Sequence, residues 1–268
     1  MALPRTYLFV PGDRPERFAK ALDTAADAVV IDLEDAVPLA AKAAARQSVA
    51  KFLAAGAQRQ RLVVRINDEN SPEFADDLAM LALHGAAAVM LPKAERVATL
   101  VRLREACPQI AVLPLLESAR GVLNAEFLAS GPGVQRLVFG TIDFALDLDL
   151  GNDPVALDYA ASRLAIASRA ADIGSPVAGV TTTIDDEAVL LADLARARCF
   201  GFGAKLCIHP KQVAPIHAAL RPSEAELAWA QRVLDAAAAS SGGAVQLDGR
   251  MVDKPVIERA RRLIQRAA

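Results

Sequence analysis

Residues 110–147 read IAVLPLLESARGVLNAEFLASGPGVQRLVFGTIDFALD, and this stretch decides the fold. An apolar run, Ala111 to Leu116, ends on Glu117, and a second run, Leu137 to Gly140, is soon followed by Asp143. An amphipathic segment lies between the runs and is stopped by Ser-Gly-Pro-Gly. The pattern predicts strand, carboxylate, helix, strand, carboxylate. Because parallel strands joined by a helix end at the same edge of a sheet, Glu117 and Asp143 are expected to face one cavity.

These two acids have two interpretations. If they face one cavity, they suit a single hard cation that is bound through oxygen. The alternative is that Glu117 and Asp143 are unrelated, solvated acids at strand ends. From this unit alone, both interpretations stand.

The same unit repeats along the chain. Apolar runs that read as further strands lie at 6–10, 28–33, 62–66, 87–91, 177–180 and 203–208. Helical segments are predicted at 14–22, 39–53, 74–83, 94–106, 119–128, 154–173 and 185–198. Eight strands alternating with helices over about 250 residues predict a (β/α)8 TIM barrel. A doubly wound open sheet is the alternative, but the eight units use almost the whole chain and no GxGxxG follows a strand, so we favour the barrel.

After His209 the repeat ends and a helical tail is predicted. Its parts are a helix at 224–239 capped by Ser223, a flexible break at 240–243, a small loop or hairpin at 245–253, and a basic helix from Pro255. We therefore expect a catalytic barrel domain over 1–222 and a C-terminal helical extension over 223–268. The extension cannot be a ninth barrel unit, so it packs on the barrel or reaches a neighbouring subunit.

Composition argues against several classes of partner. The formal net charge is −2 and there is no basic tract, so nucleic acid is not an expected partner. Although 53% of the residues are hydrophobic, no apolar run approaches the roughly 18 residues of a membrane span. The N-terminus lacks the pattern of a signal peptide, and the three cysteines are scattered, which favours the cytoplasm. The three histidines lack metal-ligand spacing, so a histidine-based zinc site is not expected.

The barrel prediction gathers polar residues at one mouth, because the carboxyl ends of the strands meet there. The expected set is Asp32, Glu34, Asp35, Arg65, Lys93, Glu117, Asp143 and His209. Acids outnumber bases in this set, so we expect a bound cation. Oxygen ligands of this kind suit Mg²⁺ better than Zn²⁺.

Arg65 is the natural partner for a substrate carboxylate, because its planar fork binds both oxygens. The alternative is a structural ion pair with the acidic cluster. Asp32 and Asp35 are expected to orient a neighbouring cation rather than to contact the substrate. Lys93 has the position of a Schiff-base lysine, but the nearby acids favour a charged, paired lysine. His209 is expected to fix a loop.

An ordered set of motifs runs along nearly the whole chain. The motifs are LFVPG at 8–12, RPERF at 14–18 with Lys20, DLEDAV at 32–37, VRIN at 64–67, LPK at 91–93, ES at 117–118, FG at 139–140 with DF at 143–144, and IHP at 208–210. In these motifs the chain resembles the HpcH/HpaI aldolase and citrate lyase β-subunit family. A single motif such as Pro-Lys is weak evidence for this family, whereas the ordered set of motifs is highly specific for it.

The resemblance implies a (β/α)8 barrel that cleaves or forms a carbon–carbon bond through an acyl thioester enolate. The substrate would be a 3-hydroxyacyl-CoA-type thioester (citryl-, malyl- or citramalyl-CoA), and the products a 2-oxo acid and an acyl-CoA. The implied site residues are Glu117 and Asp143 for Mg²⁺, Arg65 and Glu117 for the substrate, Arg65 and Glu34 for catalysis, and Arg14 and Lys20 for the coenzyme A phosphates.

The tail carries one further motif, GRMVDKP at 249–255. It is similar to the C-terminal motif of stand-alone acyl-CoA lyases, in which an aspartate enters the active site of the adjacent subunit. The resemblance thus implies that Asp253 is the catalytic acid/base and that the protein is a homo-oligomer, with a trimer expected. Two other functions remain as alternatives. One is a lyase subunit that acts on an acyl-carrier-protein thioester within a complex, and the other is a barrel that binds metal and ligand without turnover.

Overall fold

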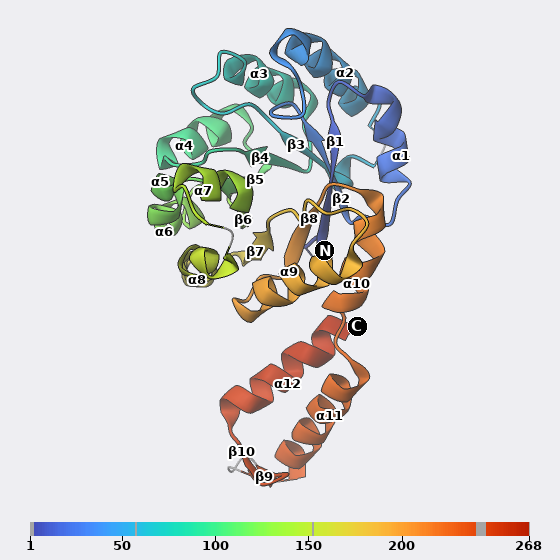
Figure 1. The fold of residues 1–268 in the computed structure, drawn as a ribbon, viewed down its shortest axis with the longest axis vertical. Coiled ribbons are helices and arrows are strands. Elements are labelled where there is room, and N and C mark those ends of the chain that lie inside the picture. The colour runs from blue at the N-terminus through green and yellow to red at the C-terminus, as the bar shows by residue number, and fades with distance from the viewer. Residues whose placement is uncertain (1–2, 57, 152, 240–244, 268) are drawn as a thin grey trace. The chain divides into compact units, whose positions relative to one another are not determined.

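The computed structural model describes residues 3–56, 58–151, 153–239 and 245–267. Within these ranges the chain forms two compact units, Met1–Ile216 and His217–Ala268 (Figure 1). The domain boundary expected at 222/223 therefore lies inside the second unit.

The first unit contains a closed barrel of parallel strands. In the described residues its order is β1 (Thr6–Pro11), β2 (Ala28–Asp32), β3 (Leu62–Arg65), β4 (Ala88–Leu91), β5 (Ala111–Leu116), β6 (Arg136–Phe139), β7 (Gly174–Ala178) and β8 (Ala204–Cys207). Each strand pairs with the next, and β8 returns to β1 through the register Tyr7↔Leu206. The predicted (β/α)8 barrel is confirmed, and the open sheet is wrong.

The barrel core follows the period-two alternation of the strands. Tyr7, Val30, Val63, Leu113 and Val138 belong to one buried cluster that fills the interior. Their neighbours in sequence are also buried, as expected for parallel strands covered by helices on the outside. Arg65 has the parity of Val63, so the last residue of β3 carries its side chain into the mouth of the barrel.

Helices surround these strands (Figure 1). They are α1 (Phe18–Leu22), α2 (Lys42–Ala54), α3 (Phe74–His84), α4 (Val97–Ala106), α5 (Ala119–Leu123), α6 (Ala125–Ala129), α7 (Thr141–Asp147), α8 (Asp158–Ala170), α9 (Glu187–Cys199) and α10 (Val213–Leu220). Short 3-10 turns lie at η1 (Pro15–Arg17), η2 (Leu39–Ala41), η3 (Arg59–Arg61), η4 (Pro154–Leu157) and η5 (Pro210–Gln212).

The helices differ from the prediction in two respects. The helix expected at 119–128 is divided at Asn124, which leaves the helical conformation and donates from its side chain to the carbonyl of Glu95 over 2.9 Å. Helices α7 and α10 were not predicted. Both are short, and α7 begins directly at the mouth, so its sequence was interpreted only as a strand followed by an acid.

The second unit is a helical hairpin with a small antiparallel ribbon. It contains α11 (Glu224–Ala239), β9 (Val245–Leu247), β10 (Arg250–Val252) and α12 (Lys254–Ala267), around a core of Ala230, Val233, Val252, Ala260 and Leu263. The predicted cap is confirmed: Ser223 Oγ accepts from the N–H of Glu226 over 3.2 Å, and the Glu226 carboxylate accepts from the N–H of Ser223 over 2.8 Å. The predicted hairpin is present as β9 and β10. The break expected at 240–243 lies outside the described residues.

No helix in the described ranges is both long and apolar enough to cross a membrane.

Candidate active site

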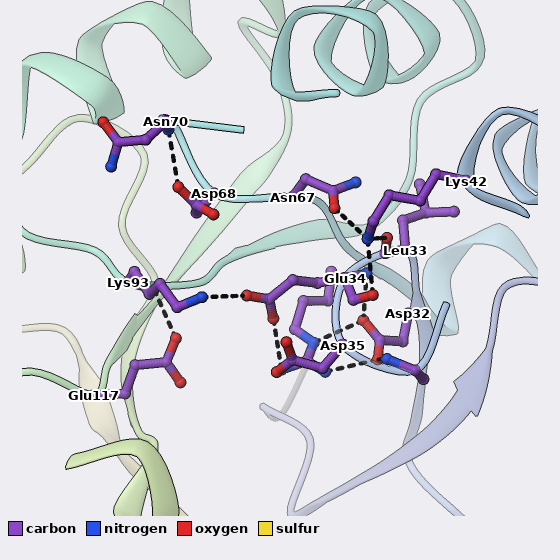
Figure 2. A network of polar contacts seen from close by, with 12 residues as sticks. Asp32, Leu33, Glu34, Asp35, Lys42, Asn67, Asp68, Asn70, Lys93 and Glu117 are labelled. Carbon is purple, nitrogen blue, oxygen red and sulfur yellow. Dashed lines mark hydrogen bonds and ion pairs between the residues drawn. The ribbon is translucent and has the colours of Figure 1, made fainter. Parts of the chain in front are cut away.

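The carboxyl ends of four neighbouring strands bring most of the residues predicted for the mouth into one polar network (Figure 2). Asp32 and Arg65 are the last residues of β2 and β3, Lys93 follows β4, and Glu117 follows β5. The β2 end continues into an acid loop, which we define as Asp32–Asp35. The mouth predicted from the sequence is thus formed by the folded chain.

Arg65 is the centre of this network. Its Nε and Nη2 donate to the two oxygens of Asp32 over 2.7 and 2.6 Å, and its Nη1 lies 2.9 Å from Glu34 Oε2. The guanidinium also stacks on Phe9 of β1, 5.0 Å from the ring centroid. Burial alone would lower the pKa of Arg65, but the hydrogen bonds and charge of Asp32, with the charges of Glu34 and Asp35, outweigh it and raise that pKa. The predicted role of Asp32 in orienting a cation agrees with this geometry.

Glu34 and Lys93 form an ion pair. Lys93 Nζ lies 3.3 Å from Glu34 Oε1. Burial raises the pKa of Glu34 to about 7, although Arg65 opposes this shift. For Lys93, burial alone would lower the pKa, but the charge of Glu34 reverses the effect and the pKa is raised. Lys93 is therefore the charged, paired lysine that was expected, and a Schiff-base role is not supported.

Glu117 is buried, with 4% of its surface exposed. Its Oε1 accepts from the backbone N–H of Lys93 over 2.8 Å. Burial, then the charges of Glu34 and Asp143, raise the pKa of Glu117 to about 8. A Cβ on Gly140 would lie 2.6 Å from both Cβ and Oε2 of Glu117, so only glycine fits at this approach to α7.

Asp143 lies in the first turn of α7 and is half-buried. Its charge acts on Glu117, so the two acids predicted to share a cavity are electrostatic neighbours. No group of three or more His, Cys, Asp or Glu side chains in the described ranges is arranged to hold a metal ion. The pair nevertheless fits a hard divalent cation, because both donors are carboxylates and the excess negative charge that raises the pKa of Glu117 would be offset. Two protein ligands suit Mg²⁺, which commonly keeps several waters.

The remaining predicted residues lie outside this network. Arg14 and Lys20 are exposed, in the turn after β1 and in α1. Asp253 belongs to the second unit, where it is exposed and its Oδ1 accepts from the N–H of Val256 over 3.2 Å at the start of α12. His209 holds its own loop, because its Nδ1 accepts from the N–H of Lys211 over 3.2 Å.

Phe9, Lys42 and Asn67 also take part in this network and were not predicted as site residues from the sequence. Phe9 lies under Arg65, and Lys42 donates to the acid loop and to Asn67. One signal for Lys42 was available, since a lysine in the first turn of a helix opposes the helix dipole and needs a compensating partner.

The fold and the mouth together define a (β/α)8-barrel enzyme with an acidic, arginine-containing site. A family model described as HpcH/HpaI aldolase/citrate lyase matches residues 5–210. The chain belongs to this family and is therefore an enzyme of a lyase family.

Individual relatives agree with this assignment. A citrate lyase subunit beta-like protein of Deinococcus radiodurans is 40% identical, covering 100% of this chain and 98% of its own. A (3S)-malyl-CoA thioesterase of Cereibacter sphaeroides is 32% identical, covering 98% and 94%. A crystal structure of protein CitE from Mycobacterium tuberculosis in complex with magnesium, acetoacetate and coenzyme A superimposes with a TM-score of 0.89 at 36% identity, covering 99% and 98%.

Proposed function

We propose that this enzyme is a Mg²⁺-dependent carbon–carbon lyase that cleaves or forms a 3-hydroxyacyl-CoA-type thioester. The products of cleavage are a 2-oxo acid and an acyl-CoA. One observation carries the proposal: a half-buried arginine, Arg65, lies in the same mouth as the carboxylate pair Glu117 and Asp143. This combination supplies a fork for a substrate carboxylate beside donors for a hard cation. The similar CitE structure of Mycobacterium tuberculosis, which contains magnesium and the carboxylate acetoacetate, supports a cation and a carboxylate as ligands.

Glu117 and Asp143 are the residues that would hold Mg²⁺. The bound cation would polarise the hydroxyl and carboxylate oxygens of the substrate and lower the free energy of alkoxide formation. Glu117 must be ionised for this role. Because its pKa is raised to about 8 by burial and by neighbouring acids, binding of the cation is coupled to loss of a proton.

Arg65 would hold the carboxylate of the 2-oxo acid. Asp32 occupies its Nε and one Nη2 donor, so donors on the outer side of the guanidinium remain for a ligand or for Glu34. The contact with Phe9 limits tilting of the guanidinium plane. Arg65 would therefore present a fixed fork, and the ion pair with Glu34 would loosen as the substrate binds.

Asp253 would act as the acid/base, taking the hydroxyl proton in cleavage or a proton of the acyl-CoA methyl in condensation. It is exposed in its own unit, so an ordinary carboxylate would be a weak base for a carbon acid. Arg14 and Lys20 are exposed cations that suit the phosphates of coenzyme A. Glu34, which lies next to Arg65, would take part in catalysis.

A second function, hydrolysis of the thioester, is favoured by the similarity to a (3S)-malyl-CoA thioesterase. The two reactions release different products. A lyase yields a 2-oxo acid and an acyl-CoA, whereas a thioesterase yields a hydroxy acid and free coenzyme A.

A panel of citryl-, malyl- and citramalyl-CoA, assayed with and without Mg²⁺, tests both functions. We expect a 2-oxo acid and an acyl-CoA from at least one thioester, and only with Mg²⁺. Free coenzyme A without a 2-oxo acid would favour hydrolysis. Turnover restricted to thioesters of an acyl carrier protein would favour the subunit function, and no product from any of these thioesters would contradict the proposal.

A further inference from the structure

Lys42, at the start of α2, has its ammonium group fully engaged by neutral oxygen atoms (Figure 2). Its Nζ donates to the carbonyls of Leu33 and Glu34 over 2.8 and 2.9 Å, and to Asn67 Oδ1 over 2.6 Å. An ammonium has three N–H donors, so all are used. Among the described residues, no carboxylate forms a salt bridge with Lys42. This lysine therefore acts on the main chain rather than as half of an ion pair.

Asn67 is fixed in the orientation that receives this donor. Its Nδ2 and its backbone N–H both donate to Asp77 Oδ2, over 2.7 and 2.9 Å. Asp77 is 1% exposed, and its Oδ1 accepts from Arg46 Nε over 2.7 Å. Because the amide nitrogen of Asn67 faces Asp77, its oxygen must face Lys42. Lys42 and Arg46 are four residues apart on one face of α2, so this helix anchors both sides of Asn67.

The acid loop is held by two sets of hydrogen bonds. Lys42 takes the carbonyls of Leu33 and Glu34, while the N–H groups of Glu34 and Ala36 donate to the Asp32 carboxylate over 2.9 and 3.1 Å. The same carboxylate receives the two donors of Arg65. Any rotation of the loop peptides that breaks the bonds to Lys42 would also move the groups that hold Asp32. The position of Arg65 is thus linked to Lys42 through the loop.

We propose that Lys42 is a positioning residue, which locks the acid loop against the end of β3 and so holds Arg65 in place for the substrate carboxylate. The inference rests on the proposed function, because it assumes that Arg65 binds the 2-oxo acid. It adds a residue of α2 that acts through the loop and Asn67 rather than by touching the substrate. Loss of Lys42 leaves two loop carbonyls and Asn67 Oδ1 without their common donor.

The test compares Lys42→Met and Lys42→Arg with the wild type and with Lys51→Met. Methionine keeps the length of the side chain but has no donor, whereas arginine keeps donors and charge. Lys51 lies on the exposed surface of the same helix and serves as the matched control. Binding of glyoxylate, pyruvate and oxaloacetate in the presence of Mg²⁺, and separately of coenzyme A, is measured by calorimetry. Hydrogen–deuterium exchange of the segment 32–37 reports on the loop directly.

We expect Lys42→Met to weaken binding of the 2-oxo acid by about tenfold or more, because the fork is displaced. Coenzyme A affinity should change by less than about twofold, since its phosphates are proposed to meet Arg14 and Lys20 rather than the loop. Exchange of the Glu34 and Ala36 amides should accelerate in Lys42→Met, recover in part in Lys42→Arg, and stay unchanged in Lys51→Met.

Two results would overturn the proposal. The first is unchanged exchange in 32–37 in folded Lys42→Met, and the second is faster exchange with wild-type affinity for the 2-oxo acid. If Lys42→Met does not fold, as judged by circular dichroism, Lys42→Gln and Lys42→Arg carry the same comparison. Failure of the proposed function gives a different result: the wild type itself would bind none of the 2-oxo acids, and the exchange data alone would then decide whether Lys42 fixes the loop.

Discussion

The backbone N–H of Lys93 donates a hydrogen bond to the side-chain oxygen Oε1 of Glu117 over 2.8 Å. Lys93 adopts a left-handed conformation there, with φ of +46°, which is uncommon for a residue with a side chain. Its ammonium turns instead to Glu34. The loop after β4 thus orients Glu117 with a neutral donor, and burial keeps the pKa of Glu117 high until a cation arrives.

Glu117→Gln should stabilise the metal-free enzyme at high pH. The pKa of Glu117 is raised from an ordinary 4.5 to about 8, so the native state keeps a proton that the unfolded chain has lost. The free energy of unfolding of the wild type therefore decreases as the pH rises from the lower to the higher of these two values. Glutamine, which still accepts a hydrogen bond from the N–H of Lys93, removes this loss. We expect the Tm with EDTA to exceed the wild-type value by about 5 °C at pH 8. The difference should vanish near pH 4.5, and Glu105→Gln, on the exposed face of α4, should show none.

Glu117→Ala and Asp143→Ala should each abolish Mg²⁺-dependent turnover while the fold is retained. Calorimetry should show loss of Mg²⁺ binding in both. In the wild type, titration at pH 7 in buffers of different ionisation enthalpy should show release of protons, because Glu117 must ionise. Wild-type Mg²⁺ affinity in both variants would mean that these acids are not the ligands.

Arg65→Lys should retain the charge but lose most activity. An ammonium cannot reproduce the fork that Asp32 holds on one side and the substrate would meet on the other. Binding of the 2-oxo acid should weaken by about a hundredfold, much more than binding of coenzyme A. Equal weakening of both ligands would identify Arg65 as a structural residue of the ion-pair network.

Gly140→Ala should disturb the site because of a single methyl group. The new Cβ would meet Glu117 Cβ and Oε2 at 2.6 Å, so Glu117 or the start of α7 must shift. We expect a loss of about 1–3 kcal/mol in stability, measured by chemical denaturation, together with weaker Mg²⁺ binding. Gly151→Ala is the matched control, since a Cβ there meets no atom within 4 Å. Equal behaviour of the two variants would contradict the close approach described here.

Mixing inactive Asp253→Ala subunits with inactive Glu117→Ala subunits tests whether the active site is shared. If the tail of one chain serves the barrel of a neighbour, some mixed sites receive an intact Glu117 from one chain and an intact Asp253 from the other. Activity should then return after subunit exchange. Exchange confirmed by native mass spectrometry without recovery of activity would place Asp253 in its own chain or outside the mechanism.

The sequence was sufficient for the strand order and for the residues at strand ends. Periodicity predicts where each buried strand stops, and the parallel arrangement then determines that Arg65 and Glu117 share a mouth. The network around them could not be predicted in the same way. Lys42 meets Asn67 across 25 residues of sequence, and such a contact depends on the packing of α2 against the barrel. The role of Phe9 could not be predicted either, because an apolar residue within a strand gives no sign that it contacts a cation.

The closure of the barrel has a consequence for how the chain folds. Thr6 of β1 is aligned with Lys205 of β8, so the last pairing joins nearly opposite ends of the first unit. Adjacent strand pairs can form as they are synthesised, but β1 keeps an unpaired edge until β8 is made. A chain released or cleaved before residue 204 would expose two strand edges, where strands of other chains can add. Chains truncated in this way are therefore expected to aggregate, rather than to lose only one subsite.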